Sequence, residues 1–123
     1  MLRVMIADDH TVVRRGLIQI IKENFSESTI QEAADYPGVF AALTASTFDI
    51  LILDLFMPEG NGLDAIKVIK SRYEQMPVLV LSMYPEDQFA LRVLKAGASC
   101  YLNKESMPEE LVFAMKEFLH GRK

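Results

Sequence analysis

The sequence predicts an α/β domain of three layers, in which five helices cover both faces of a doubly wound, five-stranded parallel sheet. Short apolar runs alternate strictly with segments whose apolar residues recur every three or four positions, as strands and helices do in α/β folds. The first, third and fourth runs are almost continuously apolar, which is typical of strands buried on both faces. Half of the 123 residues are hydrophobic, enough for one core. We therefore expect a single domain over residues 1–123.

The first four elements lie in residues 2–45. Leu2–Ala7 is an apolar run and is expected to form the first strand. Val12–Asn24 carries apolar residues at helical spacing and is expected to form the first helix. Thr29–Ala34 and Pro37–Ala45 repeat this order and are the expected second strand and second helix. Helical crossovers of this kind join parallel strands.

The middle of the chain contains two more strand–helix pairs. Ile50–Leu53 and Val78–Ser82 are apolar almost throughout, and we expect the third and fourth strands there. Leu63–Arg72 and Glu86–Ala96 have apolar residues at helical spacing and are the expected third and fourth helices. Gly97 directly follows the fourth helix and predicts a left-handed cap.

The last pair closes the pattern. Ser99–Leu102 is the expected fifth strand and Pro108–His120 the expected fifth helix. Ser106, with Glu109 three residues later, forms a capping-box pattern at the start of this helix. Gly121–Lys123 resembles the start of a linker, so we expect the chain to be a truncated piece of a longer protein.

Composition and charge exclude several classes of protein. The net charge is −4 and the Lys and Arg residues are scattered, so we expect no direct binding of nucleic acid. The apolar runs are far shorter than the roughly 20 residues that cross a bilayer, and acidic residues come too early for a signal peptide. We expect no membrane partner and a cytoplasmic location. The single cysteine, Cys100, is expected to be a small buried hydrophobe.

Three carboxylates stand where strands end. Asp8 and Asp9 follow the first strand, and Asp54 follows the third. In a sheet of order 2-1-3-4-5 these strands are neighbours where the winding direction reverses, which is where such sheets bind ligands. Carboxylates held this close oppose one another's ionisation or bind a cation, and an all-oxygen site with few protein ligands suits Mg²⁺. Taken singly, each acid also fits a helix cap or an ordinary strand end.

Two further polar residues end the fourth and fifth strands. Ser82 brings a hydroxyl and Lys104 an ammonium group to the same edge of the sheet. Together with a carboxylate nucleophile and a divalent ion, these groups suit phosphoryl transfer. An ionised aspartate needs no histidine to remove a proton, so we expect His10 to begin the first helix as a solvated surface residue.

These residues resemble the response regulator receiver family of two-component systems, over essentially the whole chain. Within that family the sequence is most similar to the NarL/FixJ (LuxR-type) subfamily. The implied fold is flavodoxin-like (CheY-like). The motifs that carry the resemblance are Asp8-Asp9-His10, Arg14–Leu17, Asp54-Leu55-Phe56-Met57-Pro58 with Gly62, Leu81-Ser82-Met83, Gly97-Ala98 and Leu102-Asn103-Lys104.

The resemblance implies a phosphorylation site with a bound metal ion. Asp54 would accept a phosphoryl group from a sensor histidine kinase. Asp9, Asp54 and the backbone carbonyl of Phe56 would bind Mg²⁺ directly, and Asp8 would bind it mainly through water.

The resemblance also implies a switch. Ser82 and Lys104 would contact the phosphoryl group, and the rotamer of Tyr101 would follow the shift of Ser82. Phe56 and Tyr84 depart from the usual pattern of the family. Both would flank the path of the hydrolytic water, so we expect them to slow dephosphorylation.

The implied role is that of a signalling switch rather than an enzyme, although the domain would catalyse its own phosphorylation and slow dephosphorylation. Its expected partners are a sensor histidine kinase, a second copy of the receiver in a homodimer, and an effector domain. In this subfamily the effector is a C-terminal helix-turn-helix DNA-binding domain, through which the full-length protein would control transcription.

Three alternatives compete with this interpretation. A magnesium-dependent phosphohydrolase needs similar groups, but its nucleophile belongs to an Asp-x-Asp motif after the first strand, and it generally needs a cap domain. A binding module that works without phosphorylation would need only the surface of the domain. A nucleotide-binding flavodoxin-like protein is disfavoured because no glycine-rich loop follows the first strand.

Overall fold

A computed structural model, which describes residues 1–106 and 108–120, has the expected α/β architecture. Within these residues, five parallel strands form one sheet in the order β2-β1-β3-β4-β5, so the predicted topology is confirmed. The strands are β1 (Leu2–Ala7), β2 (Ser28–Ala33), β3 (Ile50–Asp54), β4 (Val78–Ser82) and β5 (Cys100–Asn103).

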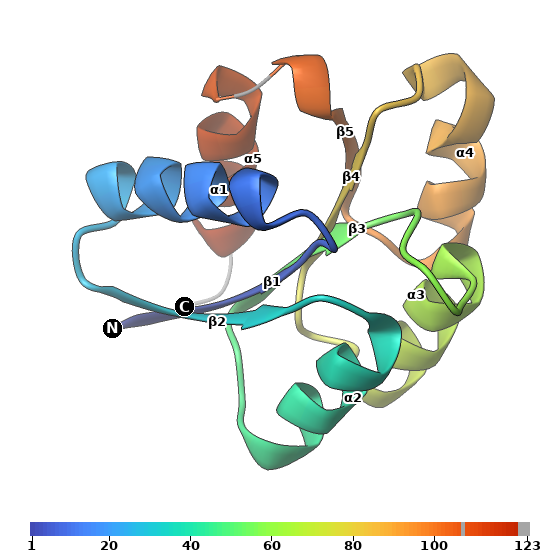
Figure 1. The fold of residues 1–123 in the computed structure, drawn as a ribbon, viewed down its shortest axis with the longest axis horizontal. Coiled ribbons are helices and arrows are strands. Elements are labelled where there is room, and N and C mark those ends of the chain that lie inside the picture. Colours follow the sequence, from blue (N-terminus) through green and yellow to red (C-terminus); the bar gives the residue numbers. More distant parts are fainter. Residues whose placement is uncertain (107, 121–123) are drawn as a thin grey trace.

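Helices cover both faces of this sheet. They are α1 (Thr11–Asn24), α2 (Tyr36–Ala45), α3 (Gly62–Arg72), α4 (Glu86–Ala96) and α5 (Glu109–His120). Helices α1 and α5 lie on one face, and α2, α3 and α4 lie on the other (Figure 1). The limits of all ten predicted elements agree with the structure to within one residue, but a short 3-10 helix at Lys104–Ser106 was not predicted. In the part of the chain that is described, the helices are too short or too polar to span a membrane.

The core has two halves, one on each face of the sheet. Strands β3 and β4 are buried along their whole length. Leu51 and Leu53 of β3 pack toward α2, α3 and α4, whereas Ile50 and Ile52 pack toward α1 and α5. Burial of each such side chain stabilises the fold by about 1.5–3 kcal/mol. Packing from both sides therefore fixes the end of β3, which carries Asp54.

Caps delimit the helices. Gly97 ends α4 in the left-handed region with a φ of 118°, as predicted. Asn61 caps α3, because its side-chain oxygen accepts a hydrogen bond from the backbone N–H of Asp64 at 3.1 Å. The Ser106 side chain of the predicted capping box and the predicted linker start Gly121–Lys123 lie outside the described residues.

Cys100 differs from its prediction. The side chain is half-buried rather than buried, and it packs against the core half that contains α1 and α5. The difference follows from strand order, because β5 is an edge strand with a neighbour on one side alone.

Candidate functional site

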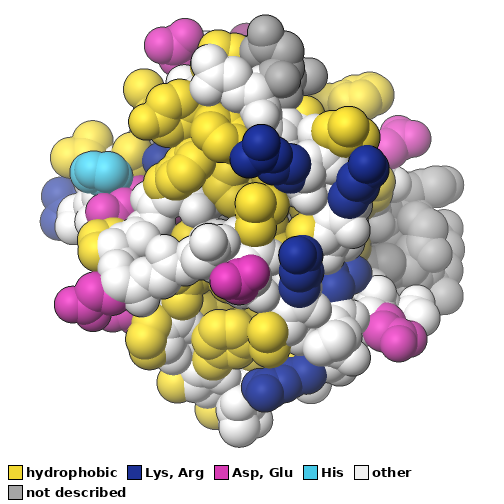
Figure 2. All heavy atoms as spheres, turned by 90° about the vertical axis from the view of Figure 1, so that its right-hand side faces the viewer, with side chains coloured by type: hydrophobic (Ala, Val, Ile, Leu, Met, Phe, Trp, Pro, Cys, Tyr) yellow, Lys and Arg dark blue, Asp and Glu magenta, His cyan; other side chains and the backbone are white. Residues whose placement is uncertain are grey.

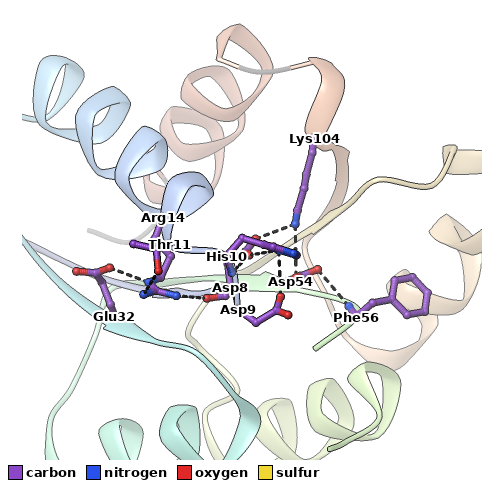
Figure 3. Close-up of polar contacts among 9 residues, drawn as sticks. All are labelled: Asp8, Asp9, His10, Thr11, Arg14, Glu32, Asp54, Phe56 and Lys104. Carbon is purple, nitrogen blue, oxygen red and sulfur yellow. Dashed lines mark hydrogen bonds and ion pairs between the residues drawn. The ribbon is translucent and has the colours of Figure 1, made fainter. Parts of the chain in front are cut away.

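The strand order brings three acids together at the carboxyl edge of the sheet. Ala7 of β1 pairs with Leu53 of β3, so the residues that follow them, Asp8 and Asp54, lie side by side. One carboxylate oxygen from each of Asp8, Asp9 and Asp54 lies within 4.8 Å of the others (Figure 3). Asp8 and Asp54 are buried, and Asp9 is partly exposed. The cluster therefore opens to solvent on the side of Asp9.

Lys104 reaches this cluster from the end of β5. Its Nζ lies 2.8 Å from Oδ2 of Asp8 and 3.4 Å from Oδ2 of Asp54 (Figure 3). The lysine side chain is itself nearly buried, with 9% of its surface exposed. One ammonium group therefore bridges two buried carboxylates and offsets part of their mutual repulsion.

The electrostatics single out Asp54. Burial raises the pKa of its carboxyl group to about 6, even though the nearby Lys104 lowers it; Asp8 raises it further, and the Phe56 N–H lowers it. A carboxylate with this pKa is largely ionised at pH 7 but poorly solvated. Such a group gains from any additional cation that binds beside it.

The carboxylate oxygens fit a divalent cation. Asp8 Oδ2 and Asp9 Oδ1 are buried, and no uncharged backbone or side-chain donor among the described residues hydrogen-bonds to them. Their polar contacts are with cationic or ionisable nitrogens, Lys104 Nζ for Asp8 and, at 3.2 Å, His10 Nδ1 for Asp9. Lys104 compensates the charge of these acids in part, so a further cation beside them would be favourable, and an oxygen ligand set suits Mg²⁺.

The loop after β1 is held by two basic residues. The backbone N–H of His10 donates to Asp8 Oδ1 at 2.8 Å, and its ring Nδ1 lies 3.3 Å from the same oxygen. The His10 ring is mostly exposed and precedes α1, as expected, but its contacts with the acids were not predicted. Arg14 donates to the backbone carbonyl of Asp8 at 2.6 Å and pairs with Glu32 at 2.8 Å (Figure 3). Arg14 thereby ties the acid-bearing loop to β2.

Ser82 and Tyr101 are linked through one residue. Ser82 is fully buried at the end of β4, and its Oγ accepts a hydrogen bond from the Tyr84 N–H at 3.0 Å. The Tyr101 hydroxyl donates to the backbone carbonyl of Tyr84 at 2.7 Å, and Tyr101 is also buried. Any displacement of the backbone at Tyr84 therefore moves or breaks the hydrogen bonds of both Ser82 and Tyr101.

Three aromatic rings, two from the segments after β3 and β4 and one from α4, pack together. Phe56, Tyr84 and Phe89 make edge-to-face contacts with one another, with ring centroids 5.1–5.3 Å apart. Phe56 and Tyr84 are each 48% exposed. The molecular face on the side of α3 and α4 has hydrophobic side chains gathered beside Lys and Arg (Figure 2). Phe89 had no predicted role, because its contact with the other two rings depends on how α4 packs.

Tyr36 was also not identified from the sequence. This tyrosine is buried, and its hydroxyl donates to the carbonyl of Leu55, next to Asp54. Burial raises the pKa of Tyr36 to about 12, although a backbone hydrogen bond from Met57 lowers it; the acids Asp54 and Asp9 raise it further. Its hydroxyl is therefore protonated, and a donor, at neutral pH.

A parallel sheet of this strand order, with three acids and a lysine at its carboxyl edge, defines the class of signalling receiver domains. The sequence profile of the response regulator receiver domain matches residues 4–116. The chain therefore belongs to the response regulator receiver family, as the sequence motifs indicated.

Several relatives are regulators of transcription. The transcriptional regulatory protein YdfI of Bacillus subtilis is 38% identical over 121 residues, which cover 97% of this chain and 55% of YdfI. The DNA-binding transcriptional activator DevR/DosR of Mycobacterium tuberculosis is 34% identical over 122 residues, which cover 99% of this chain and 56% of that protein. This chain thus spans slightly more than half the length of these curated relatives.

A solved structure agrees with this assignment. The crystal structure of a LuxR-family two-component response regulator from Aurantimonas sp. superposes with a TM-score of 0.88 at 35% identity, covering 97% of this chain and 85% of that one. The predicted NarL/FixJ (LuxR-type) relationship is confirmed.

Proposed function

We propose that a sensor histidine kinase transfers a phosphoryl group to Asp54 in a reaction that depends on Mg²⁺. The observation that carries this proposal is the buried Asp54 carboxylate, which lies 3.4 Å from the Lys104 ammonium group and in one cluster with the carboxylates of Asp8 and Asp9. Such a carboxylate is a nucleophile flanked by a fixed cation and by ligands for a second one. Family membership supports the same role.

In the transfer, a carboxylate oxygen of Asp54 attacks phosphorus, and the phosphorus–nitrogen bond of the donor phosphohistidine breaks. The bonding electrons stay on the imidazole nitrogen, and the product is an acyl phosphate on Asp54. No proton has to leave the nucleophile, because a carboxyl group with a pKa of about 6 is largely ionised at pH 7.

The acids would bind the metal ion. Asp9, Asp54 and the backbone carbonyl of Phe56 would hold Mg²⁺ directly, and Asp8 would hold it through water. This assignment is supported by the carboxylate oxygens of Asp8, Asp9 and Asp54, which lie within 4.8 Å of one another, and by the buried Asp9 Oδ1, whose polar contact among the described residues is with His10. When bound, Mg²⁺ offsets the charge on the transferring phosphoryl group.

Phosphorylation would be read out through Ser82 and Tyr101. Lys104 would exchange its contacts with the acids for one with a phosphoryl oxygen, and the Ser82 hydroxyl would donate to another. Ser82 now holds the Tyr84 N–H, and Tyr101 holds the Tyr84 carbonyl. A shift of Ser82 would therefore move Tyr84 and, with it, Tyr101. The surface of α4, β5 and α5 changes as a result, and the domain acts as a switch that an effector reads.

The effector is inferred from the relatives. We infer a C-terminal helix-turn-helix DNA-binding domain in the full-length protein, because this chain matches 55–56% of the length of regulators named for transcription and DNA binding. A cytoplasmic location follows for a protein that acts on bacterial DNA. A homodimer of receivers would align two such domains on a two-fold site.

The aromatic rings would set the lifetime of the phosphorylated state. Phe56 and Tyr84 each lie two residues after a site residue, Asp54 and Ser82, and their rings contact that of Phe89. We propose that they exclude or misplace the hydrolytic water, so Phe56→Asn or Tyr84→Asn shortens the half-life of the Asp54 phosphate several-fold. Phe113→Asn, at an exposed site on α5, is the matched control and leaves the half-life unchanged. If the Asp54 phosphate of the wild type has a half-life of seconds and neither Phe56→Asn nor Tyr84→Asn changes it, this proposal is wrong.

The main proposal is tested by intact mass after incubation with acetyl phosphate. The wild-type chain gains the mass of one phosphoryl group when Mg²⁺ is present and none when Mg²⁺ is chelated. Asp54→Asn gains nothing, whereas Asp64→Asn, which changes an exposed acid on α3, behaves as wild type. No adduct on the wild-type chain under any condition would instead favour a binding module that works without phosphorylation.

A further inference from the structure

Tyr36 is a buried polar side chain that the proposed phosphoryl transfer does not use. It begins α2, directly after the N-cap residue Asp35, and only 4% of its surface is exposed. A buried hydroxyl requires a hydrogen-bond partner. The hydrogen-bond partner of the Tyr36 hydroxyl therefore indicates the role of this residue.

The hydroxyl of Tyr36 donates to the start of the loop between β3 and α3. Its oxygen lies 2.7 Å from the carbonyl oxygen of Leu55 and 3.2 Å from that of Asp54. A hydroxyl has one proton, so the shorter contact with Leu55 is the main hydrogen bond. This bond joins α2 to the residue that follows the phosphoryl acceptor.

The accepting carbonyl belongs to a peptide unit that also contacts the acceptor side chain. The carbonyl of Leu55 and the N–H of Phe56 are two ends of one planar peptide. That N–H donates to Oδ1 of Asp54 at 3.2 Å (Figure 3). A donor on the carbonyl of a peptide strengthens its N–H as a donor. The Tyr36 hydroxyl thus orients and polarises the group that holds the Asp54 carboxylate.

The loop closes around the tyrosine ring. A Cβ atom at Gly60 would lie 2.4 Å from Cδ2 of Tyr36, and one at Gly62 would lie 2.9 Å from its hydroxyl oxygen and 2.1 Å from the carbonyl of Leu55. Both distances to the tyrosine are too short for a carbon substituent at rest. The path of the loop therefore fits the ring and hydroxyl of Tyr36 closely.

We propose that Tyr36 is a positioning residue for phosphoryl transfer, whose hydroxyl fixes the peptide between Leu55 and Phe56. Held in this position, the peptide keeps the Phe56 N–H against the Asp54 carboxylate. It also sets the direction of the backbone at Phe56, whose carbonyl is a proposed Mg²⁺ ligand. The inference rests on the proposed phosphorylation of Asp54 and extends it to a residue outside the acidic cluster.

The test is Tyr36→Phe, which keeps the ring and removes the hydroxyl. Tyr73→Phe is the matched control, because Tyr73 is half-buried at the opposite end of α3 from the loop. The first readout is hydrogen exchange of the Phe56 amide by NMR in metal-free protein, compared with Val80 in the buried strand β4. The second readout consists of two measurements. One is the affinity for Mg²⁺, and the other is the rate of phosphorylation by acetyl phosphate at saturating Mg²⁺.

Loss of the hydroxyl is expected to speed exchange at Phe56 about tenfold, the equivalent of about 1.4 kcal/mol for a lost buried hydrogen bond. Exchange at Val80 stays unchanged, while Mg²⁺ binding and the phosphorylation rate fall in Tyr36→Phe alone. Unchanged exchange at Phe56 overturns the proposal, and so does an equal rise at Phe56 and Val80, which would indicate a general structural role. Wild-type protein that takes up no phosphoryl group would refute the proposed function, whereas a wild-type rate in Tyr36→Phe would refute this inference alone.

Discussion

Replacing Asp54 by asparagine is expected to stabilise the metal-free fold at neutral pH. Asp54 is 3% exposed, and the pKa of its carboxyl group is raised to about 6 from an ordinary value of 3.8. Between these two values the folded state binds more protons than the unfolded state, so the free energy of unfolding falls as pH rises. Asparagine is neutral at every pH and removes this loss.

The size of the effect follows from the two pKa values. The difference between the two pKa values corresponds to about 3 kcal/mol in the free energy of unfolding. The wild type has lost all of this stability at about pH 7 and regains most of it at about pH 4. This value is an upper bound, because the neutral amide of the variant would no longer pair with the Lys104 ammonium group, which lies 3.4 Å from Asp54 in the wild type. We expect Asp54→Asn to exceed the wild type by about 1–3 kcal/mol at pH 7.

Urea unfolding monitored by circular dichroism between pH 4.5 and 7.5, with a chelator present, measures this difference. The matched variant Asp64→Asn reports the effect of the same chemical change at a solvent-exposed site. Adding Mg²⁺ should stabilise the wild type by about 2.7 kcal/mol at 100 times its dissociation constant and should do less for Asp54→Asn. A stability difference that is the same at pH 4.5 and pH 7 would refute the reasoning.

Three further predictions concern the surroundings of the site. Lys104→Met removes the cation that bridges Asp8 and Asp54; we expect a loss of about 3–5 kcal/mol in metal-free protein, measured by urea unfolding, and a loss that Mg²⁺ fails to reduce would contradict this account. Arg14→Met leaves the Asp8 carbonyl without its 2.6 Å donor; thermal unfolding should show a loss of about 1–3 kcal/mol, with Arg15→Met, on an exposed part of α1, as the control. Gly97→Ala places a Cβ on a residue with a φ of 118° and 2.8 Å from Cγ of Lys70; we expect a loss of about 1–2 kcal/mol, and unchanged stability would mean that the α4 cap tolerates side chains.

Much of the fold could be predicted because its signals are local. Apolar runs and helical spacing depend on which residues face the core, and the burial of β3 and β4 on both faces made those strands easy to recognise. The short helix at Lys104–Ser106 was missed, because one turn of 3-10 helix leaves no periodic pattern.

The acidic cluster could be anticipated because strand ends share one edge in a parallel sheet. The topology alone brings Asp8 and Asp54 together through the pairing of Ala7 with Leu53. The contacts of Tyr36 could not be anticipated, since its hydrogen bond to Leu55 depends on how the loop after β3 packs against the start of α2. A tyrosine next to a proline at a helix start carries no sequence signal for such a contact.

The assembly of the acidic cluster with Lys104 also depends on the order in which the strands of the sheet pair during folding. Asp54 ends β3, and Asp8 and Lys104 directly follow β1 and β5, so the three meet only after pairings between residues far apart in sequence have formed. Such long-range pairings form late and slowly in folding. The cluster of Asp8, Asp54 and Lys104 is therefore assembled only after β5 has docked on β4. If Asp54 is phosphorylated as proposed, only molecules whose sheet is complete would accept the phosphoryl group.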